Sequence, residues 1–331
     1  MADFFSNGYA VVVGAGADLP ITVNDAQGIA DLLRAPDRCA YPTDHVQLLT
    51  DQVARRDAVL AALDRLAVQV ANDSEATAVV YFSGHGLETP AYHLMPFGYN
   101  LNNLSATSIS GIEFTEKLRA IQAKKLLVLL DCCHAGGIGD AKGEPLAKSP
   151  IPLGLFDALK MGSGRVIMAS SHRDEKSMWY RNDPYSAFTC VLLQALAGYG
   201  AFEPDGYARV LDVALWLGRK VPERTGDEQH PIIKVSNLED NFALAYYAGG
   251  ARIPKSLEWD KPIPAITSGL DRAQIDSWQR MLSNYRENMI LIEERMSEYV
   301  EFNNISLDLI RNKRKTEARI ADLERKLGLQ E

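Results

Sequence analysis

The chain has 331 residues, of which 47% are hydrophobic, and carries a formal net charge of −8 at pH 7. This length suits one large domain or two smaller ones with a packed core, and the negative charge argues against general nucleic-acid binding. No apolar run reaches membrane-spanning length, the first residues lack the basic lead of a secretory signal, and four scattered cysteines form no disulfide framework. We therefore expect a reduced, cytoplasmic protein that binds neither membrane nor nucleic acid.

A strand is predicted at residues 9–13, and a glycine-containing loop follows it at residues 14–20. Gly14 and Gly16 match the first two glycines of a dinucleotide-binding fingerprint, but Leu19 occupies the position of the third. A tight structural loop therefore fits better than a nucleotide site, and no cofactor is expected.

Helical periodicity predicts a helix at residues 22–34, with Asn24 or Asp25 available as its N-cap. A second strand is predicted at residues 45–49, and a second helix from residue 50 to about residue 70. Each of these helices has one apolar face, which is typical of a helix that covers a sheet.

The third predicted strand, residues 78–83, ends in Gly84-His85-Gly86. The two glycines should leave His85 exposed at the strand end, with the neighbouring amides accessible. A turn-rich stretch with a short strand at residues 92–96 follows, and a helix at residues 112–121 leads to the next strand.

Residues 126–137 read LLVLLDCCHAGG, a fully apolar run that ends in polar residues. Such a run is typical of a strand buried on both faces of a parallel sheet, and open α/β sheets form their sites at the carboxyl ends of strands. If this strand neighbours residues 78–83, His85 and a cysteine emerge at the same edge. An ordinary thiol, with a pKa of about 8.5, is only slightly ionised at neutral pH, so a nearby imidazole that takes its proton produces a nucleophile.

The motifs FSGHG at residues 82–86 and DCCHAGG at residues 131–137 resemble the two catalytic blocks of caspase-like cysteine peptidases, most closely the metacaspase and bacterial orthocaspase branch. His85 precedes Cys133 by 48 positions, close to the separation of about 50 in caspases. In that pattern the nucleophile directly precedes a histidine, which selects Cys133 over Cys132. The resemblance covers roughly residues 8–250.

This resemblance implies a caspase-hemoglobinase sandwich of the α/β class, with a mostly parallel central sheet flanked by helices. It implies a cysteine-type endopeptidase with a Cys133–His85 dyad and an oxyanion hole made by the backbone N–H groups of Gly86 and Cys133. By analogy, the enzyme would cleave protein or peptide substrates in bacterial stress or defence signalling.

Alternation along a strand places Asp131 on the same face as Cys133. A carboxylate beside the nucleophile suits substrates with arginine or lysine before the scissile bond, because it can form a charge-assisted pair with them. The resemblance agrees, since animal caspases, which prefer aspartate, have glutamine in the corresponding place. Ser83 and Asp131 are therefore predicted to line the specificity pocket, with Asp174 as a further candidate. The resemblance implies that Asp25, in the setting Asn24-Asp25-Ala26, lines the same pocket. For Asp25 the alternative is a helix cap.

A zinc site at Cys132, Cys133 and His134 is not expected, because vicinal cysteines fit one tetrahedral ion poorly and no C-x-x-C pair accompanies them. Cys132 is predicted to be a packed, inert thiol and His134 a local structural residue. Metacaspases often carry a calcium-binding insertion near residues 87–110, but Glu88 is the single carboxylate there, so calcium is not expected either.

Residues 135–164 are rich in glycine, proline and lysine and are predicted to be a flexible connection. The resemblance implies that this junction joins two halves of the catalytic domain and is cut on activation. Lys142 and Lys148 then become candidates for self-cleavage, and a solvated loop is the alternative.

Further elements are predicted along the rest of the catalytic domain. They are a strand at residues 165–170, helices at 186–197 and 207–221, a strand at 231–235 and a final segment at 242–247. Between the first two, Trp179 and Tyr180 could wall a peptide groove or belong to the core.

The catalytic domain is expected to end near residue 250, and a proline-containing linker covers residues 251–269. Residues 270–331 then have apolar positions at steps of three and four, which predicts a long helix or helical hairpin of coiled-coil type. This segment could bind a partner protein, self-associate or fold back on the catalytic domain. Two other functions stay open: an inactive caspase-like scaffold that acts through this helix, and a nucleotide-binding α/β domain.

Overall fold

The computed structural model describes residues 4–88, 91–134, 164–172, 183–236, 240–260 and 307–326, together with 175, 177–180, 238 and some positions between 285 and 296. At Cys133 and His134 it describes the backbone. The chain divides into two compact units, Met1–Asp260 and Lys261–Glu331, which are considered separately.

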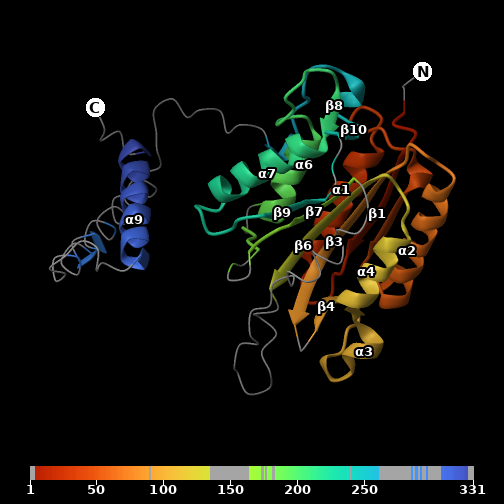
Figure 1. The fold of residues 1–331 in the computed structure, drawn as a ribbon, viewed down its shortest axis with the longest axis horizontal. Helices are drawn as coiled ribbons and strands as arrows, with labels where there is room; N and C mark the ends of the chain where they lie inside the picture. The colour runs from red at the N-terminus through yellow and green to blue at the C-terminus, as the bar shows by residue number, and fades with distance from the viewer. Residues whose placement is uncertain are drawn as a thin grey trace. The chain divides into compact units, whose positions relative to one another are not determined.

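The first unit is built on an eight-stranded sheet (Figure 1). The main strands follow the order β2-β1-β3-β6-β7-β9, in which the first five are parallel and β9 is antiparallel to β7. A hairpin strand, β4, pairs with β3, and β5 pairs with β4. The bounds are β1 (Gly8–Gly14), β2 (Val46–Thr50), β3 (Thr77–Glu88), β4 (Tyr92–Met95), β5 (Ile109–Ser110), β6 (Lys125–His134), β7 (Arg165–Ala169) and β9 (Ile232–Ser236). Two further strands, β8 (Tyr207–Arg209) and β10 (Ala243–Tyr246), form a separate antiparallel pair.

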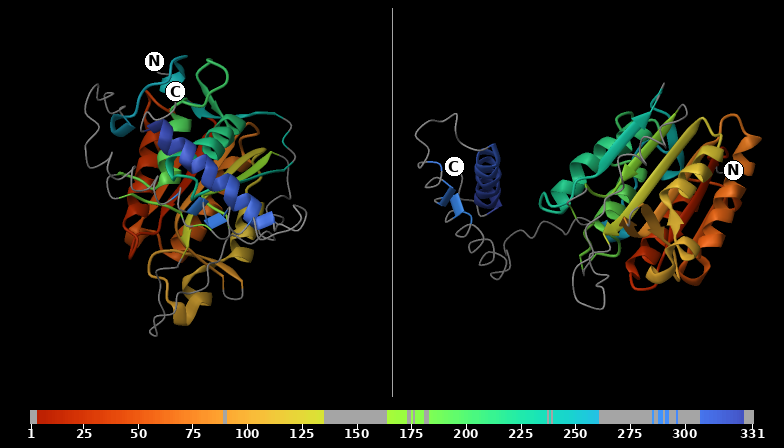
Figure 2. Two further views of the ribbon diagram at one scale, coloured as in Figure 1. Left: turned by 90° about the vertical axis from the view of Figure 1, so that its left-hand side faces the viewer. Right: turned by 60° about the horizontal axis from the view of Figure 1, so that its bottom comes forward.

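Helices cover both faces of the central sheet (Figure 2). On one face, α1, α6 and α7 pack over Tyr81 and Leu129, and on the other α2 and α4 pack over Phe82 and Leu130. The side chains alternate between the two faces because successive residues of a strand point to opposite sides. The helices are α1 (Ile21–Arg34), α2 (Arg56–Ala71), α3 (Leu104–Thr107), α4 (Gly111–Ala120), α6 (Ala187–Leu196) and α7 (Val210–Arg224).

The predicted α/β sandwich with a mostly parallel central sheet is confirmed, but the starts of two helices were wrong. The second helix begins at Arg56 rather than at residue 50, because Asp51 has a left-handed φ of 50° and opens a short 3-10 turn at Asp51–Val53. Residues 207–209 form β8 instead of the first turn of a helix, because they pair with β10.

In the second unit, α9 spans Leu307–Lys326. It lies inside the segment for which the sequence predicts a long helix, and the coiled coil and the linker at residues 251–269 stay predictions. Among the residues that the structure describes, no helix is long and apolar enough to cross a membrane.

Candidate active site

The candidate site lies where β3 and β6 extend beyond their other neighbours. β1 pairs with β3 only as far as Ser83, and β7 pairs with β6 only as far as Leu130. Beyond these points β3 and β6 continue to pair with each other, and the β4 hairpin supports the far side of β3. The expectation that the strands end at Ser83 and Leu130 was therefore wrong: the first motif lies within β3, and residues 131–134 of the second lie within β6, which gives these residues a fixed register.

That register brings the two predicted catalytic residues together. His85 is the direct partner of Cys133 across the parallel β3–β6 pair, flanked by Gly84 opposite Cys132 and Gly86 opposite His134. The backbone of Gly86, the predicted oxyanion donor, also lies opposite Leu94 of β4.

His85 is buried, not exposed as the flanking glycines suggested, and the residue is 9% accessible. Its Nε2 atom lies 3.1 Å from Oδ2 of Asp18, in the loop after β1. Its Nδ1 atom is buried and has no hydrogen-bond partner among the residues described. Asp18 also accepts a hydrogen bond from the Tyr99 hydroxyl at 3.2 Å.

Cys132, the alternative nucleophile, belongs to the apolar core. Its side chain packs in the cluster between the sheet and the layer of α2 and α4. Burial raises the pKa of the Cys132 thiol to about 12, so the thiol is protonated at neutral pH. The predicted role of Cys132 as a packed thiol therefore agrees with its surroundings.

The predicted pocket residues Asp25, Ser83 and Asp131 form one buried cluster. Each of the two carboxylates is 1% exposed. Asp25 accepts hydrogen bonds from Ser83 Oγ at 3.0 Å and from the backbone N–H of Ser186 at 2.8 Å. The helix-cap alternative for Asp25 was wrong, because α1 begins at Ile21 and Asp25 lies inside it, facing the sheet.

Hydroxyl groups surround Asp131. Ser177 and Thr189 each donate to its carboxylate at 2.9 Å, and the Ser186 hydroxyl bonds to Oδ2. Ser186, which also caps α6, thus contacts both acids through its N–H and its hydroxyl. Our sequence interpretation missed these hydroxyl residues, although the serine that begins the predicted helix at residues 186–197 is a recognisable N-cap signal.

The surroundings of Asp25 and Asp131 disfavour the ionised form of each carboxyl. Burial first, and then the negative charge of Asp131, raise the pKa of Asp25 well above its usual value. Burial also raises the pKa of Asp131, and hydrogen bonds from Ser186, Ser177 and Thr189 oppose that rise. No lysine or arginine in the described part of the chain pairs with either carboxylate. Within the part of the chain that the structure describes, the cluster is therefore an acidic site without a counter-charge.

This arrangement predicts a pH-dependent cost to stability. A carboxyl whose pKa is raised in the folded state binds its proton more tightly there, so stability is lost as the pH rises from the unfolded pKa of about 4 through the raised folded value. Asp25→Asn removes that charge and keeps a carbonyl acceptor for the Ser186 N–H. We expect its thermal midpoint to exceed that of the wild type by a few degrees at pH 8, and the difference to vanish near pH 4. Equal or lower stability of the variant at pH 8 would contradict this account.

The other residues singled out in the sequence either lie outside the residues that the structure describes or are exposed. Asp174, Lys142 and Lys148 lie outside the described residues. Trp179 and Tyr180 are exposed, so they do not belong to the core. No group of metal-ligating side chains occurs among the residues described.

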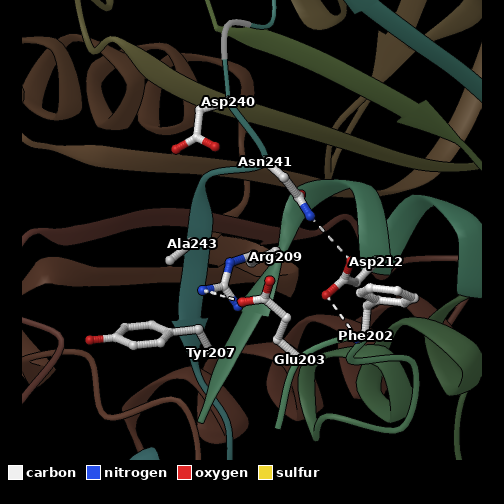
Figure 3. Close-up of a pocket in the computed structure, with 8 residues that line it drawn as sticks. All are labelled: Phe202, Glu203, Tyr207, Arg209, Asp212, Asp240, Asn241 and Ala243. Carbon is white, nitrogen blue, oxygen red and sulfur yellow. Dashed lines mark hydrogen bonds and ion pairs between the residues drawn. The ribbon is translucent and has the colours of Figure 1, made fainter. Parts of the chain in front are cut away.

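A separate pocket of about 420 Å³ lies at β8 and β10 (Figure 3). Its buried Asp212 accepts hydrogen bonds from Asn241 and from the Phe202 N–H, both at 3.2 Å, and Arg209 is paired with Asp205. None of the predicted catalytic or specificity residues lines it. The lining residues are Phe202, Glu203, Tyr207, Arg209, Asp212, Asp240, Asn241 and Ala243.

The family model described as "Caspase domain" matches residues 6–243, which is more than half of the chain. The protein therefore belongs to the caspase-domain family of cysteine peptidases. A comparison with curated proteins gives no significant match.

Many solved structures match this chain, and two of them illustrate the similarity. One is a protein from Geobacter sulfurreducens, with 14% identity, a TM-score of 0.47, and coverage of 74% of this chain and 98% of that chain. The other is drICE, with 13% identity, a TM-score of 0.37, and coverage of 70% of this chain and 93% of that chain.

Proposed function

We propose that this protein is a cysteine endopeptidase of the metacaspase or orthocaspase branch that cleaves after arginine or lysine. The observation that carries the proposal is the pair of buried acids, Asp25 and Asp131, beside the position where His85 and Cys133 are register partners. Ser83 belongs to the same pocket, and Asp174 is a further candidate lining residue.

The charge of the cluster selects the substrate. Two buried carboxylates that repel each other and have no lysine or arginine partner among the described residues are stabilised by a positively charged ligand, and a guanidinium can form paired hydrogen bonds with a carboxylate. An acidic side chain would instead bring a further carboxyl group to the cluster, with nothing to balance its negative charge. The hydroxyl of Ser177, which comes from a connecting segment, is the Asp131 partner that an incoming guanidinium can replace.

The chemistry follows from the neighbouring dyad. His85 takes the thiol proton of Cys133, and the thiolate attacks the scissile carbonyl carbon. The imidazolium then gives its proton to the leaving amine as the C–N bond breaks, and water hydrolyses the thioester. Backbone N–H groups of Gly86 and Cys133 would stabilise the oxyanion, a contribution of about 3 kcal/mol for each donor.

The remaining roles extend this proposal. Self-cleavage at Lys142 or Lys148 fits the same basic specificity, and recovery of only intact chain from concentrated active enzyme would count against it. Residues 270–331 would bind a partner protein or a second copy of the chain. A cytoplasmic role in bacterial stress or defence is the corresponding biological setting.

The alternative functions fit the structure less well. A nucleotide-binding loop needs free backbone N–H groups for phosphate, but the N–H groups of Ala15, Gly16 and Leu19 donate within the protein. A scaffold without activity does not need a cysteine and a histidine in direct register. The catalytic proposal accounts both for the loop whose N–H groups donate within the protein and for the register of His85 with Cys133.

Hydrolysis of short fluorogenic peptides that end in arginine, lysine or aspartate tests the proposal. We expect release of the fluorophore after arginine and lysine and little release after aspartate. Cleavage after aspartate alone would overturn the basic specificity and leave a cysteine peptidase. No cleavage of any peptide, even after the 135–164 junction has been cut by an added protease, would favour the scaffold.

A further inference from the structure

The loop after β1 contributes a side chain to the predicted catalytic histidine. Asp18 Oδ2 lies 3.1 Å from His85 Nε2 and accepts a second hydrogen bond from Tyr99 at 3.2 Å. The ring of Tyr99 also packs edge-on to the imidazole, with 6.3 Å between the ring centroids. Two residues from separate loops thus define the orientation of His85 on one side.

This contact determines which ring nitrogen of His85 is free. An ionised carboxylate only accepts hydrogen bonds, so the Nε2 atom beside Asp18 carries the hydrogen, and the lone pair of the neutral ring lies on Nδ1. Nδ1 is the buried atom that has no partner in the described part of the chain, and the residue faces Cys133 in the strand register. The free lone pair therefore belongs to the nitrogen that remains available to accept the thiol proton.

Hydrogen bonds to β3 and to α1 hold the backbone of this loop in place. The Ala15 N–H donates to the Ser83 carbonyl at 2.9 Å, and the Gly16 N–H donates to Thr22 Oγ1 at 2.8 Å. Gly16 has a left-handed φ of 66°, and a Cβ there would lie 2.3 Å from Asp51 Oδ1. The loop therefore presents Asp18 from a defined backbone conformation, which a positioning residue requires.

We propose that Asp18, oriented by Tyr99, is a positioning residue that holds His85 in the Nε2–H tautomer. In the first step the proton of the Cys133 thiol moves to Nδ1, the sulfur forms its bond to the carbonyl carbon, and Asp18 stabilises the resulting imidazolium without taking a proton. In the second step the Nδ1 proton passes to the leaving amine. This inference rests on the proposed function.

The test compares Asp18→Ala, Asp18→Asn and Tyr99→Phe with Asp57→Asn, which removes an equal charge from an exposed ion pair. We expect kcat to fall by about tenfold to a hundredfold in the two Asp18 variants with KM unchanged, by analogy with the cost of removing a hydrogen-bond partner that orients a metal-ligating histidine. Because the side chain of Asp18 is 52% exposed, the lower end is expected for Asp18→Ala. Asp18→Asn should be the slower of the two, because its amide can donate to Nε2 and favour the opposite tautomer. Tyr99→Phe should lose about threefold, and Asp57→Asn should match the wild type.

Alkylation of Cys133 by iodoacetamide, followed by mass spectrometry, separates this inference from the proposed function. Slower alkylation in the Asp18 variants supports the positioning role even if no peptide is cleaved. The lack of cleavage would then overturn the proposed function alone. Retention of kcat and of the alkylation rate within twofold of the wild type in both Asp18 variants would overturn the inference, whereas peptide cleavage by those variants would leave the proposed function intact.

Discussion

Cys133→Ala is expected to abolish peptide hydrolysis, with a loss of about 10⁴-fold or more, because removal of a nucleophile leaves only the residual catalysis of binding and the oxyanion hole. Cys132→Ala is the matched control on the adjacent residue. It removes a thiol whose pKa is raised to about 12 by burial in the apolar cluster, so it should retain activity within a few-fold and lose some stability. Rates with an arginine peptide and the thermal midpoint of each variant are the measurements.

Alkylation gives the same distinction without a substrate. Wild-type protein treated with iodoacetamide at pH 7.5 should be modified at Cys133 and not at Cys132, because the reagent reacts with thiolate. Full activity of Cys133→Ala would show that Cys133 is not the nucleophile. If Cys132→Ala alone lost activity as well, Cys132 would be the nucleophile instead.

The second large effect is expected at Asp131. Asp131→Asn should lower kcat/KM for an arginine peptide by about thirtyfold or more, since loss of one partner of a buried, hydrogen-bonded charge pair costs roughly 2–5 kcal/mol. The substitution keeps the shape of the side chain and one carbonyl oxygen. It therefore tests the charge more directly than alanine would.

A neutral substrate separates lost charge recognition from a damaged pocket. Citrulline has nearly the shape of arginine without its positive charge, so wild-type enzyme should strongly prefer the arginine peptide over the citrulline peptide. In Asp131→Asn this preference should largely disappear, while the rate with citrulline changes little. An unchanged arginine-to-citrulline ratio would remove Asp131 from the specificity pocket. Asp64→Asn, which breaks an exposed ion pair with Lys117, controls for a general change in charge.

The predicted catalytic pair depended on local features that a sequence displays. An apolar run such as residues 126–130 is compatible with few structures other than a buried strand, and the polar residues that follow it then lie at one sheet edge. The direct register of His85 with Cys133 agrees with that reasoning. The strand ends were wrong because the sequence does not show that β6 and the β4 hairpin supply partners for residues 84–88.

For Asp25 the sequence near the residue allows two roles, a helix cap or a pocket residue. An acid near the start of a helix serves equally well as a cap or as a buried group, and its role depends on the residue at which the helix begins. The structure begins α1 at Ile21, which places Asp25 one turn inside, against Ser83 and Ser186. Packing of α1 and α6 on the same face of the sheet, rather than any property of the residues near Asp25, brings these groups together.

The sequence by itself determined the α/β class and the order of the main strands along the chain, and it singled out His85 and Cys133 as the candidate catalytic pair, because these depend on short-range periodicity and on motifs. Only the tertiary structure decided that His85 is buried and that Asp18 and Tyr99 contact the imidazole. Asp18 is far from His85 along the chain, and its approach depends on the positive φ angles of Gly16 and Ala17 and on the alignment of β1 beside β3. Contacts of this kind arise from the summed geometry of several elements, and no single segment of the sequence encodes them.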